Sequence, residues 1–149
     1  MKKIFIACPF SKYLNGDEFT DEHFKTFIEN VYNLCIEYTP NVFLALEREE
    51  YGKKLMTDIC TIFDFEEMKS SDFVIAIPDD SMGVAVELGW ASVLKKQTLL
   101  ILNDNQRYTP LISGMGDITN TTIIRYDKRL DERIFIKIKE ILDHLNIKK

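Results

Sequence analysis

The fold is decided by the stretch DFVIAIPDDSMGVAVELGWASVLKKQTLLIL, residues 72–102. A short apolar run at its start is followed by the turn-forming residues 78–81 and then by a helical segment from about Gly83 to Lys95. A second apolar run, Thr98–Leu102, closes the stretch. Two near-continuous apolar strands joined by a helix are typical of a parallel sheet that is covered on both faces.

The same alternation of strands and helices extends over the rest of the chain. Further strands are predicted at Lys3–Cys8, Asn41–Leu46 and Thr121–Arg125. Helical spacing of apolar residues predicts helices after a Thr20 cap as far as Pro40, from Leu55 to about Ser70, briefly at 109–114, and from Ile134 to Leu145. The sequence therefore predicts one α/β domain over residues 1–149, with a doubly wound, flavodoxin- or Rossmann-like sheet of about five parallel strands and helices on both faces.

Composition and charge limit the kinds of partner. The 149 residues are 46% hydrophobic and 29% charged, which is ordinary for a soluble globular protein. The net charge is −5 and no segment carries a basic stripe, so a nucleic-acid polymer is not expected as a partner, whereas a single nucleotide needs only a few donors. No apolar run approaches the roughly 18 residues that cross a bilayer, and the start MKKIFIACPF is interpreted as a strand rather than a signal peptide. We therefore expect a cytoplasmic protein without a membrane partner.

The cysteines form no recognisable metal or disulfide pattern. Cys8, Cys35 and Cys60 each lie within an apolar segment, without CxxC spacing and without a histidine nearby. We interpret them as reduced core cysteines of a cytosolic protein, so a metal site is not expected. Trp90 is interpreted as packing at a subunit interface or against the sheet, with base stacking as an alternative.

Parallel sheets bind ligands outside the carboxyl ends of their strands, and this chain has polar residues there. The candidate loops follow the predicted strands, after Cys8, Leu46, Ile77 and Leu102. Beyond the third of these strands, Ser81 and Gly83 stand where a helix begins. Unpaired backbone N–H groups at a helix start suit a phosphate, the Ser81 hydroxyl adds a donor, and Gly83 allows close approach of the backbone. Both residues are therefore candidates for phosphate binding.

Two carboxylates stand among apolar residues, where an ionised group is costly unless it is paired or used in chemistry. Glu87 lies about one turn into the predicted helix, and Asp64 lies in the preceding one. The alternatives are that Glu87 pairs with a lysine or caps a neighbouring loop, and that Asp64 lies on a solvated helix face. Two carboxylates beside one pocket are the arrangement with which glycosidases attack an anomeric carbon and move a proton. Glu87 and Asp64 are thus the candidate catalytic residues.

Three segments carry a resemblance to a known family: IFIACPF (residues 4–10), DICTIFDFEEMKSSDFVIAIPDDSMGVAVELGWASVLKKQTLLIL (58–102) and YTPLISGMGD (108–117). With them the chain resembles the nucleoside 2'-deoxyribosyltransferase family. The resemblance is strongest to the branch of nucleoside 5'-monophosphate N-glycosidases, which includes Rcl and the CMP and hydroxymethyl-CMP hydrolases. It implies that Glu87 is the nucleophile, and that Asp64 assists protonation of the leaving base and positions the substrate.

The resemblance also bears on the phosphate and on the assembly. Where deoxyribosyltransferases carry an aspartate for the sugar 5'-hydroxyl, this chain has Ser81, as the monophosphate hydrolases do. An aspartate repels a phosphate dianion and a serine at a helix start donates to it, so a 5'-phosphate is expected. A hydroxyl from the neighbouring subunit is implied at Thr109, with Ser113 as an alternative, although Thr109 before Pro110 equally fits a helix N-cap. The resemblance thus implies a homodimer or higher homo-oligomer with shared active sites.

The chain departs from the family pattern at its first strand and loop. Members acting on deoxyribose commonly have a tyrosine where Phe5 stands, and the phenylalanine leaves room for a 2'-hydroxyl. A CMP-like ribonucleotide is therefore favoured, the alternative being that Phe5 is a plain core residue. The glycine-rich phosphate loop of Rcl is replaced by residues 9–12, so Ser11 and Lys12 are weaker phosphate candidates. Glu47, nearest the end of the second strand, is a candidate acceptor for a base amino group or part of a solvated loop.

Together with these residues, the resemblance implies an enzyme that hydrolyses the N-glycosidic bond of a nucleoside 5'-monophosphate by double displacement. Glu87 attacks the anomeric carbon while Asp64 helps to protonate the base, and water then releases ribose 5-phosphate from the glutamyl-sugar ester. No metal or organic cofactor is expected, and the partner is a small-molecule nucleotide. Two alternatives stay open: a nucleoside 2'-deoxyribosyltransferase that exchanges bases, and a nucleotide-binding module without turnover.

Overall fold

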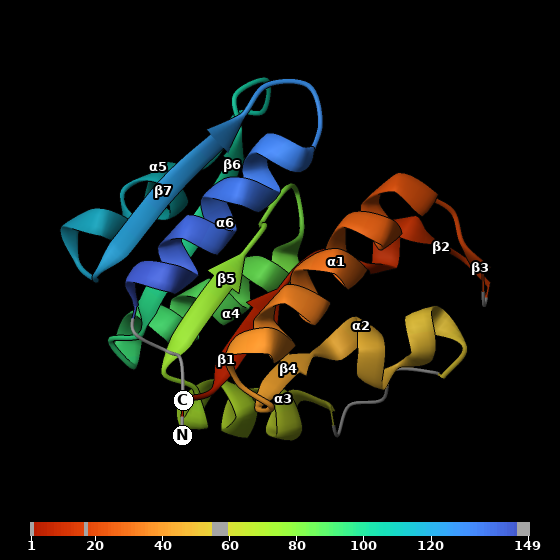
Figure 1. Cartoon of the computed structure of the whole chain (residues 1–149), viewed down its shortest axis with the longest axis horizontal. Coiled ribbons are helices and arrows are strands. Elements are labelled where there is room, and N and C mark those ends of the chain that lie inside the picture. Colours follow the sequence, from red (N-terminus) through yellow and green to blue (C-terminus); the bar gives the residue numbers. More distant parts are fainter. Residues whose placement is uncertain (1, 17, 55–59, 146–149) are drawn as a thin grey trace.

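A parallel sheet of five strands runs through the centre of the molecule in the order β4-β1-β5-β6-β7 (Figure 1). The structure is a computed structural model that describes residues 2–16, 18–54 and 60–145. The strands are β1 (Ile4–Ala7), β4 (Val42–Leu44), β5 (Phe73–Ala76), β6 (Gln97–Asn103) and β7 (Thr121–Tyr126). Each neighbouring pair is parallel, so the predicted parallel sheet is confirmed.

Helices cover both faces of the sheet, because alternate strand residues point to opposite sides. The long helices are α1 (Glu22–Tyr38), α3 (Cys60–Ser70), α4 (Met82–Val93) and α6 (Glu132–His144). Ile4 and Ile6 join the core beneath α1 and α6, which lie in front of the sheet in Figure 1. Phe5 and Ala7 join the opposite core beneath α3 and α4. The doubly wound α/β fold expected from the sequence is thus confirmed.

The direction in which the chain crosses the sheet reverses between β1 and β5. From β1 the sheet extends to β4 on one side, and from β5 through β6 to β7 on the other. The Ile77 amide donates to the Ala7 carbonyl at 2.9 Å, so β1 and β5 end side by side. Open parallel sheets bind ligands in the crevice at such a switch point, which makes the loops after β1 and β5 the place to look for a site.

The second predicted strand is shorter than expected. It was predicted over Asn41–Leu46 but ends at Leu44, because Ala45 opens the short helix α2 (Ala45–Arg48). A 3-10 turn, Glu50–Gly52, follows this helix. A helix of four residues has too few turns to show apolar periodicity in a sequence. The difference matters because α2 forms one wall of the site.

The N-cap of α1 is Asp21 rather than the predicted Thr20. The Asp21 carboxylate accepts a hydrogen bond from the Phe24 amide at 2.9 Å. The Thr20 hydroxyl instead donates to the Tyr13 carbonyl at 3.0 Å. Both residue types cap helices well, so composition alone does not choose between adjacent candidates.

The helix predicted from Leu55 is described only from Cys60, since Leu55 and Ile59 lie outside the described residues, and its predicted end at Ser70 is confirmed. The segment after β1, predicted as a loop, holds a 3-10 turn and a small hairpin. The remaining elements are the 3-10 turn Ser11–Tyr13, β2 (Leu14–Asn15), β3 (Glu18–Phe19), α5 (Pro110–Ser113) and the 3-10 turn Met115–Asp117. Within the described parts of the chain, no helix is long and apolar enough to cross a membrane.

Candidate active site

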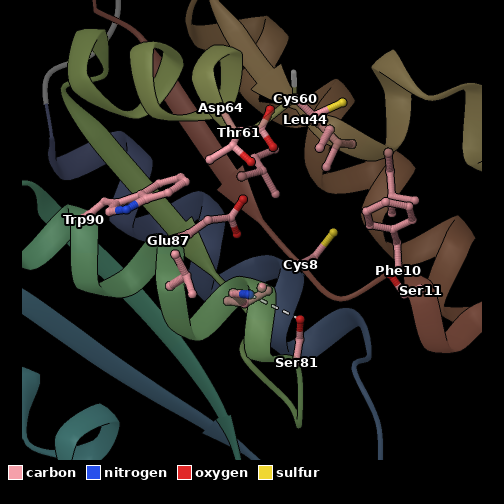
Figure 2. Close-up of a pocket in the computed structure, with 16 residues that line it drawn as sticks. Cys8, Phe10, Ser11, Leu44, Cys60, Thr61, Asp64, Ser81, Glu87 and Trp90 are labelled. Carbon is pink, nitrogen blue, oxygen red and sulfur yellow. Dashed lines mark hydrogen bonds between the residues drawn. The ribbon is translucent and has the colours of Figure 1, made fainter. Parts of the chain in front are cut away.

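A cavity of about 440 Å³ opens at the switch point of the sheet (Figure 2). Its walls come from the carboxyl ends of β1 and β4, from α2, from the start of α3 and from the first half of α4. Its polar side chains are those of Cys8, Ser11, Cys60, Thr61, Asp64, Ser81 and Glu87. Apolar side chains such as Phe10, Leu44 and Trp90 complete the lining. A cavity with a mixed lining of this kind suits a small organic ligand.

Glu87 points into this cavity from α4 (Figure 2). Val84 and Leu88 of the same helix are buried against the sheet, and Glu87 lies at the edge of that buried stripe. Burial, and next the charge of Asp64, raise the pKa of Glu87 to about 8, and the Arg48 charge opposes this rise. Within the described part of the chain no lysine forms an ion pair with Glu87, so the lysine partner considered from the sequence is not found there.

Asp64 reaches the same cavity from α3 (Figure 2). Its side chain is only 14% exposed, and its Oδ1 accepts a hydrogen bond from Nη1 of Arg48. Burial raises the pKa of Asp64 above its ordinary value; Arg48 opposes the rise, and the charges of Glu49 and Glu67 add to it. The alternative of a solvated helix face is therefore wrong. Asp64 and Glu87 share one cavity, as expected of a pair that acts on a single substrate.

Ser81 is the N-cap of α4 and lines the cavity beside Gly83. Its Oγ accepts a hydrogen bond from the Val84 amide at 3.2 Å, which leaves the hydroxyl proton free to be donated to a ligand. A Cβ added at Gly83 would meet Ser81 Oγ at 3.6 Å, an ordinary contact. Packing within the protein therefore does not require a glycine at this position. The reason to expect a glycine here remains the close approach of a ligand to the backbone.

The loop after β1 contributes Ser11 to the cavity but holds Lys12 outside it. Lys12 lines an adjoining hollow of about 380 Å³, which also contains Asp80 and Ser81. Its ammonium group forms ion pairs with Asp79 and, at 2.8 Å, with Asp80. Lys12 thus neutralises the acidic loop in front of α4 instead of presenting an unpaired charge to the cavity.

The described residues include no group of three or more His, Cys, Asp or Glu side chains arranged to hold a metal ion. The sequence profile of nucleoside 2-deoxyribosyltransferases matches residues 12–135, which is most of the chain. The chain belongs to the nucleoside 2-deoxyribosyltransferase family. Together with the paired carboxylates, this membership makes it an enzyme that acts on an N-glycosidic bond. The non-catalytic alternative is thereby disfavoured, and the substrate class is a small nucleoside or nucleotide.

Two solved structures are similar to this family member over nearly their whole length. The CMP N-glycosidase BcmB of Clostridium botulinum superposes with a TM-score of 0.67 at 28% identity, and the match covers 98% of each chain. A conserved protein from Enterococcus faecalis V583 superposes with a TM-score of 0.62 at 16% identity, over 95% of this chain and 99% of the other, and supports the fold alone. No match was found among curated protein sequences.

Besides Lys12, three of the residues proposed for substrate binding do not line the cavity of this enzyme. Phe5 is fully buried beneath it and packs on Phe43 with ring centres 4.9 Å apart, so it offers no surface to a sugar. Glu47 is exposed on α2, because the strand ends before it and the helix turns its side chain away. Thr109 is exposed at the start of α5, where its side chain accepts from the Leu111 amide at 3.4 Å, as the N-cap alternative predicted.

Sequence reasoning missed several residues of the cavity and its surroundings. Cys8 and Cys60 were interpreted as core residues, but both are half-buried and line the cavity. Trp90, for which base stacking was the alternative to packing, also lines the cavity and packs edge-on against Phe65 at 5.4 Å between ring centres. Arg48 is not among the residues that the sequence singles out, whereas its neighbour Glu47 is. The one signal for Arg48 was the presence of a lone arginine among glutamates directly after a predicted strand end.

Proposed function

We propose that this enzyme hydrolyses the N-glycosidic bond of a nucleoside 5'-monophosphate, a CMP-like ribonucleotide being favoured, to free base and ribose 5-phosphate. The observation that carries the proposal is the combination of two carboxylates, Asp64 and Glu87, with the serine-capped start of α4 in one cavity. The carboxylates suit attack at an anomeric carbon, and the helix start suits a phosphate.

The charge state of the carboxylate pair fits this reaction. Burial raises the pKa of both Asp64 and Glu87, that of Glu87 to about 8, so the pair keeps a proton to higher pH than ordinary carboxyl groups do. The reaction needs one proton for the departing base and one ionised nucleophile. As the glycosidic bond breaks, positive charge develops on the sugar and stabilises the ionised Glu87, while the proton passes through Asp64 to the base.

The proposed reaction is a double displacement. Glu87 forms an ester with the anomeric carbon, the electrons of the broken C–N bond stay with the base, and the base receives the proton. Water next attacks the same carbon, its proton returns to Asp64, and Glu87 is released as a carboxylate. The products are the free base and ribose 5-phosphate.

The phosphate preference rests on Ser81 and on the first turn of α4. The Ser81 hydroxyl retains its proton for donation, and the backbone N–H groups at the helix start carry partial positive charge. The likeness to BcmB, a CMP N-glycosidase, at 28% identity supports a cytidine monophosphate as the first substrate to try. Since Phe5 has no exposed surface, any influence on the sugar acts through the packing of the cavity floor.

We also propose that the enzyme is a homodimer, or a higher homo-oligomer, with shared active sites. Large apolar side chains are exposed on one side of the sheet, namely Ile62 and Phe63 on α3, Met82, Val86 and Val93 on α4, and Leu111 on α5. Exposed apolar side chains are costly in water when they gather on one side of a protein, and such a gathering is typical of an interface. Thr109, two residues before Leu111 and outside its own cavity, is free to complete the phosphate site of a neighbouring subunit.

Base exchange is the second candidate function, and the family profile itself favours it. A transferase passes the sugar from Glu87 to an acceptor base instead of to water. It would use nucleosides without a 5'-phosphate, whereas the proposed hydrolase depends on that phosphate.

The test is chromatography of reactions with CMP, dCMP, the other nucleoside monophosphates and cytidine. We expect free cytosine from CMP and little from cytidine, with Glu87→Gln as the matched control that releases none. Absence of base release from every monophosphate would contradict the proposal. Formation of a new nucleoside when a second free base is added would instead identify the transferase.

A further inference from the structure

The cavity holds two carboxylates, yet its described lining includes no lysine or arginine. Two neighbouring carboxylates do not ionise together without a compensating charge. That positive charge comes from outside the cavity lining: Arg48 of α2 forms an ion pair with Asp64. Arg48 thus touches the candidate catalytic pair although it does not line the cavity.

Arg48 is held in place on three sides. Its Nε and Nη2 both donate to Glu49 Oε1, at 2.9 and 2.6 Å, while Nη1 donates to Asp64 Oδ1. Its guanidinium carbon lies 5.3 Å from the centre of the Phe43 ring. A planar guanidinium that donates to two carboxylates from one rigid group fixes their relative positions, which the single ammonium of a lysine does not do.

Glu49 is the anchor of this arrangement. Its side chain is only 6% exposed, and Cys60 donates from Sγ to the same Oε1 at 3.5 Å. A buried carboxylate with a guanidinium partner is a fixed element rather than a mobile surface pair. The orientation of Asp64 therefore follows from the fixed position of Arg48.

The charges that face the pair come from several elements. Asp64 faces Arg48, Glu49, Glu67 and Glu87. Glu87 faces Asp64 and Arg48, with the Cys8 thiol close by. Against this excess of acidic groups, the single positive charge of Arg48 opposes the rise in pKa that burial causes at both Asp64 and Glu87.

We propose that Arg48 is a positioning residue for the reaction: it orients Asp64 and supplies the positive charge that allows Asp64 and Glu87 to share the cavity. The role rests on the proposed function, since it presumes that the two carboxylates act on one substrate. Arg48 acts through Asp64 and does not itself touch the substrate.

The test compares Arg48→Gln and Arg48→Lys with the wild type in a pH profile of kcat and KM. For Arg48→Gln we expect kcat near neutral pH to fall by about ten- to hundredfold, with a much smaller change in KM. The acidic limb of its profile moves up by about one pH unit, because both carboxylates hold their protons more tightly. Arg48→Lys keeps the positive charge but loses the planar guanidinium that donates to both carboxylates. The acidic limb of its pH profile therefore stays near the wild-type position, and its kcat falls less than that of Arg48→Gln. Arg133→Gln, at an exposed pair with Asp131, is the matched control and changes neither quantity.

Arg48→Gln leaves Glu49 buried without its partner, so the double variant Arg48→Gln/Glu49→Gln is measured beside it. Carboxyl resonances of Asp64 and Glu87, followed by NMR across pH in enzyme labelled with ¹³C at aspartate and glutamate, report the same charge effect without turnover. Both titrations move to higher pH in the double variant if the proposal holds, because at Asp64 the lost hydrogen bond and charge of Arg48 outweigh the lost charge of Glu49, which had raised the same pKa. Unchanged titrations, or an unchanged acidic limb, overturn it. If the wild type releases no base from any nucleotide, the proposed function fails, but the titrations still decide the role of Arg48.

Discussion

Glu87 has an environment that favours its reaction at a cost in stability. It is directed into a cavity beside Asp64, and its pKa is raised to about 8 by burial and by that neighbour. Such a carboxyl keeps its proton until a cationic sugar forms next to it. It then ionises, and its negative charge stabilises the transition state. The same environment penalises the ionised carboxylate in the free protein, as is common at active sites.

Replacing Glu87 with glutamine is expected to make stability less dependent on pH. The unfolded carboxyl loses its proton near its ordinary value of 4.5, whereas the folded one keeps it up to about pH 8. Between these values the unfolded state binds fewer protons, so the stability of the wild type falls as the pH rises. Glutamine does not ionise, so this loss is absent from Glu87→Gln.

Thermal unfolding of both proteins from about pH 5 to about pH 9 measures the effect, and the Tm of the wild type should fall several degrees further than that of the variant. Glu140→Gln, at an exposed position on α6, controls for the loss of a carboxylate as such. Parallel curves for wild type and Glu87→Gln would show that Glu87 titrates normally.

Among the secondary-structure elements, α4 contributes most to the site. Its N-cap Ser81, its first-turn Gly83 and its second-turn Glu87 all line the cavity, so one helix supplies the start that suits a phosphate and the candidate nucleophile. The distance between the phosphate-binding start of α4 and Glu87 is thus set within one rigid helix rather than between separate loops. In the proposed complex it corresponds to the distance between the phosphate and the anomeric carbon of the substrate.

The variant Ser81→Asp tests this use of the helix start. Aspartate caps a helix as well as serine does, so the variant should fold with unchanged Tm. Its charge repels a phosphate dianion, and KM for CMP is expected to rise about ten- to hundredfold. Steady-state kinetics with CMP measure the effect, and Ser81→Thr, which keeps a hydroxyl, is the matched control. An unchanged KM in Ser81→Asp would show that the phosphate does not bind at this end of the cavity.

The elements that the sequence predicts well are those with long apolar patterns. The five strands and α4 follow from continuous runs such as residues 72–102, and the burial of Asp64 and Glu87 agrees with their apolar neighbours. Helix α2 escaped prediction because four residues show no period. Glu47 was therefore expected near the ligand although it is exposed, and Arg48, which contacts Asp64, was not singled out. Which of two adjacent charged side chains faces a cavity depends on tertiary packing, which a local pattern does not contain.

At the scale of the whole molecule, large apolar side chains of α4 and α5 are exposed in the described part of the chain. Leu111 is 83% exposed on α5 and Val93 is 82% exposed on α4, while Ile112, next to Leu111, packs into the same core layer as α4. The two exposed side chains thus lie on the side of the sheet that carries the cavity. An interface there would cover apolar surface and bring a neighbouring Thr109 toward the phosphate end.

Leu111→Asp is expected to separate the subunits, because a charge is costly in an apolar interface. Light scattering after size-exclusion chromatography should give twice the chain mass of 17.4 kDa for the wild type and the single mass for the variant. Its base release should fall with the loss of the neighbouring Thr109. Ile136→Asp on α6, another exposed apolar position, is the control and should stay a dimer. A monomeric wild type with full activity would refute the shared site.

The stereochemistry of sugar transfer tests the central claim, attack by Glu87 on the anomeric carbon, most directly. Methanol competes with water for a glycosyl-enzyme, and NMR of the methyl riboside 5-phosphate formed from CMP gives the anomeric configuration. Two displacements through a Glu87 ester predict retention, which is the β-methyl riboside. A product of the α configuration alone would mean a single displacement by solvent, and Glu87 would not be the nucleophile.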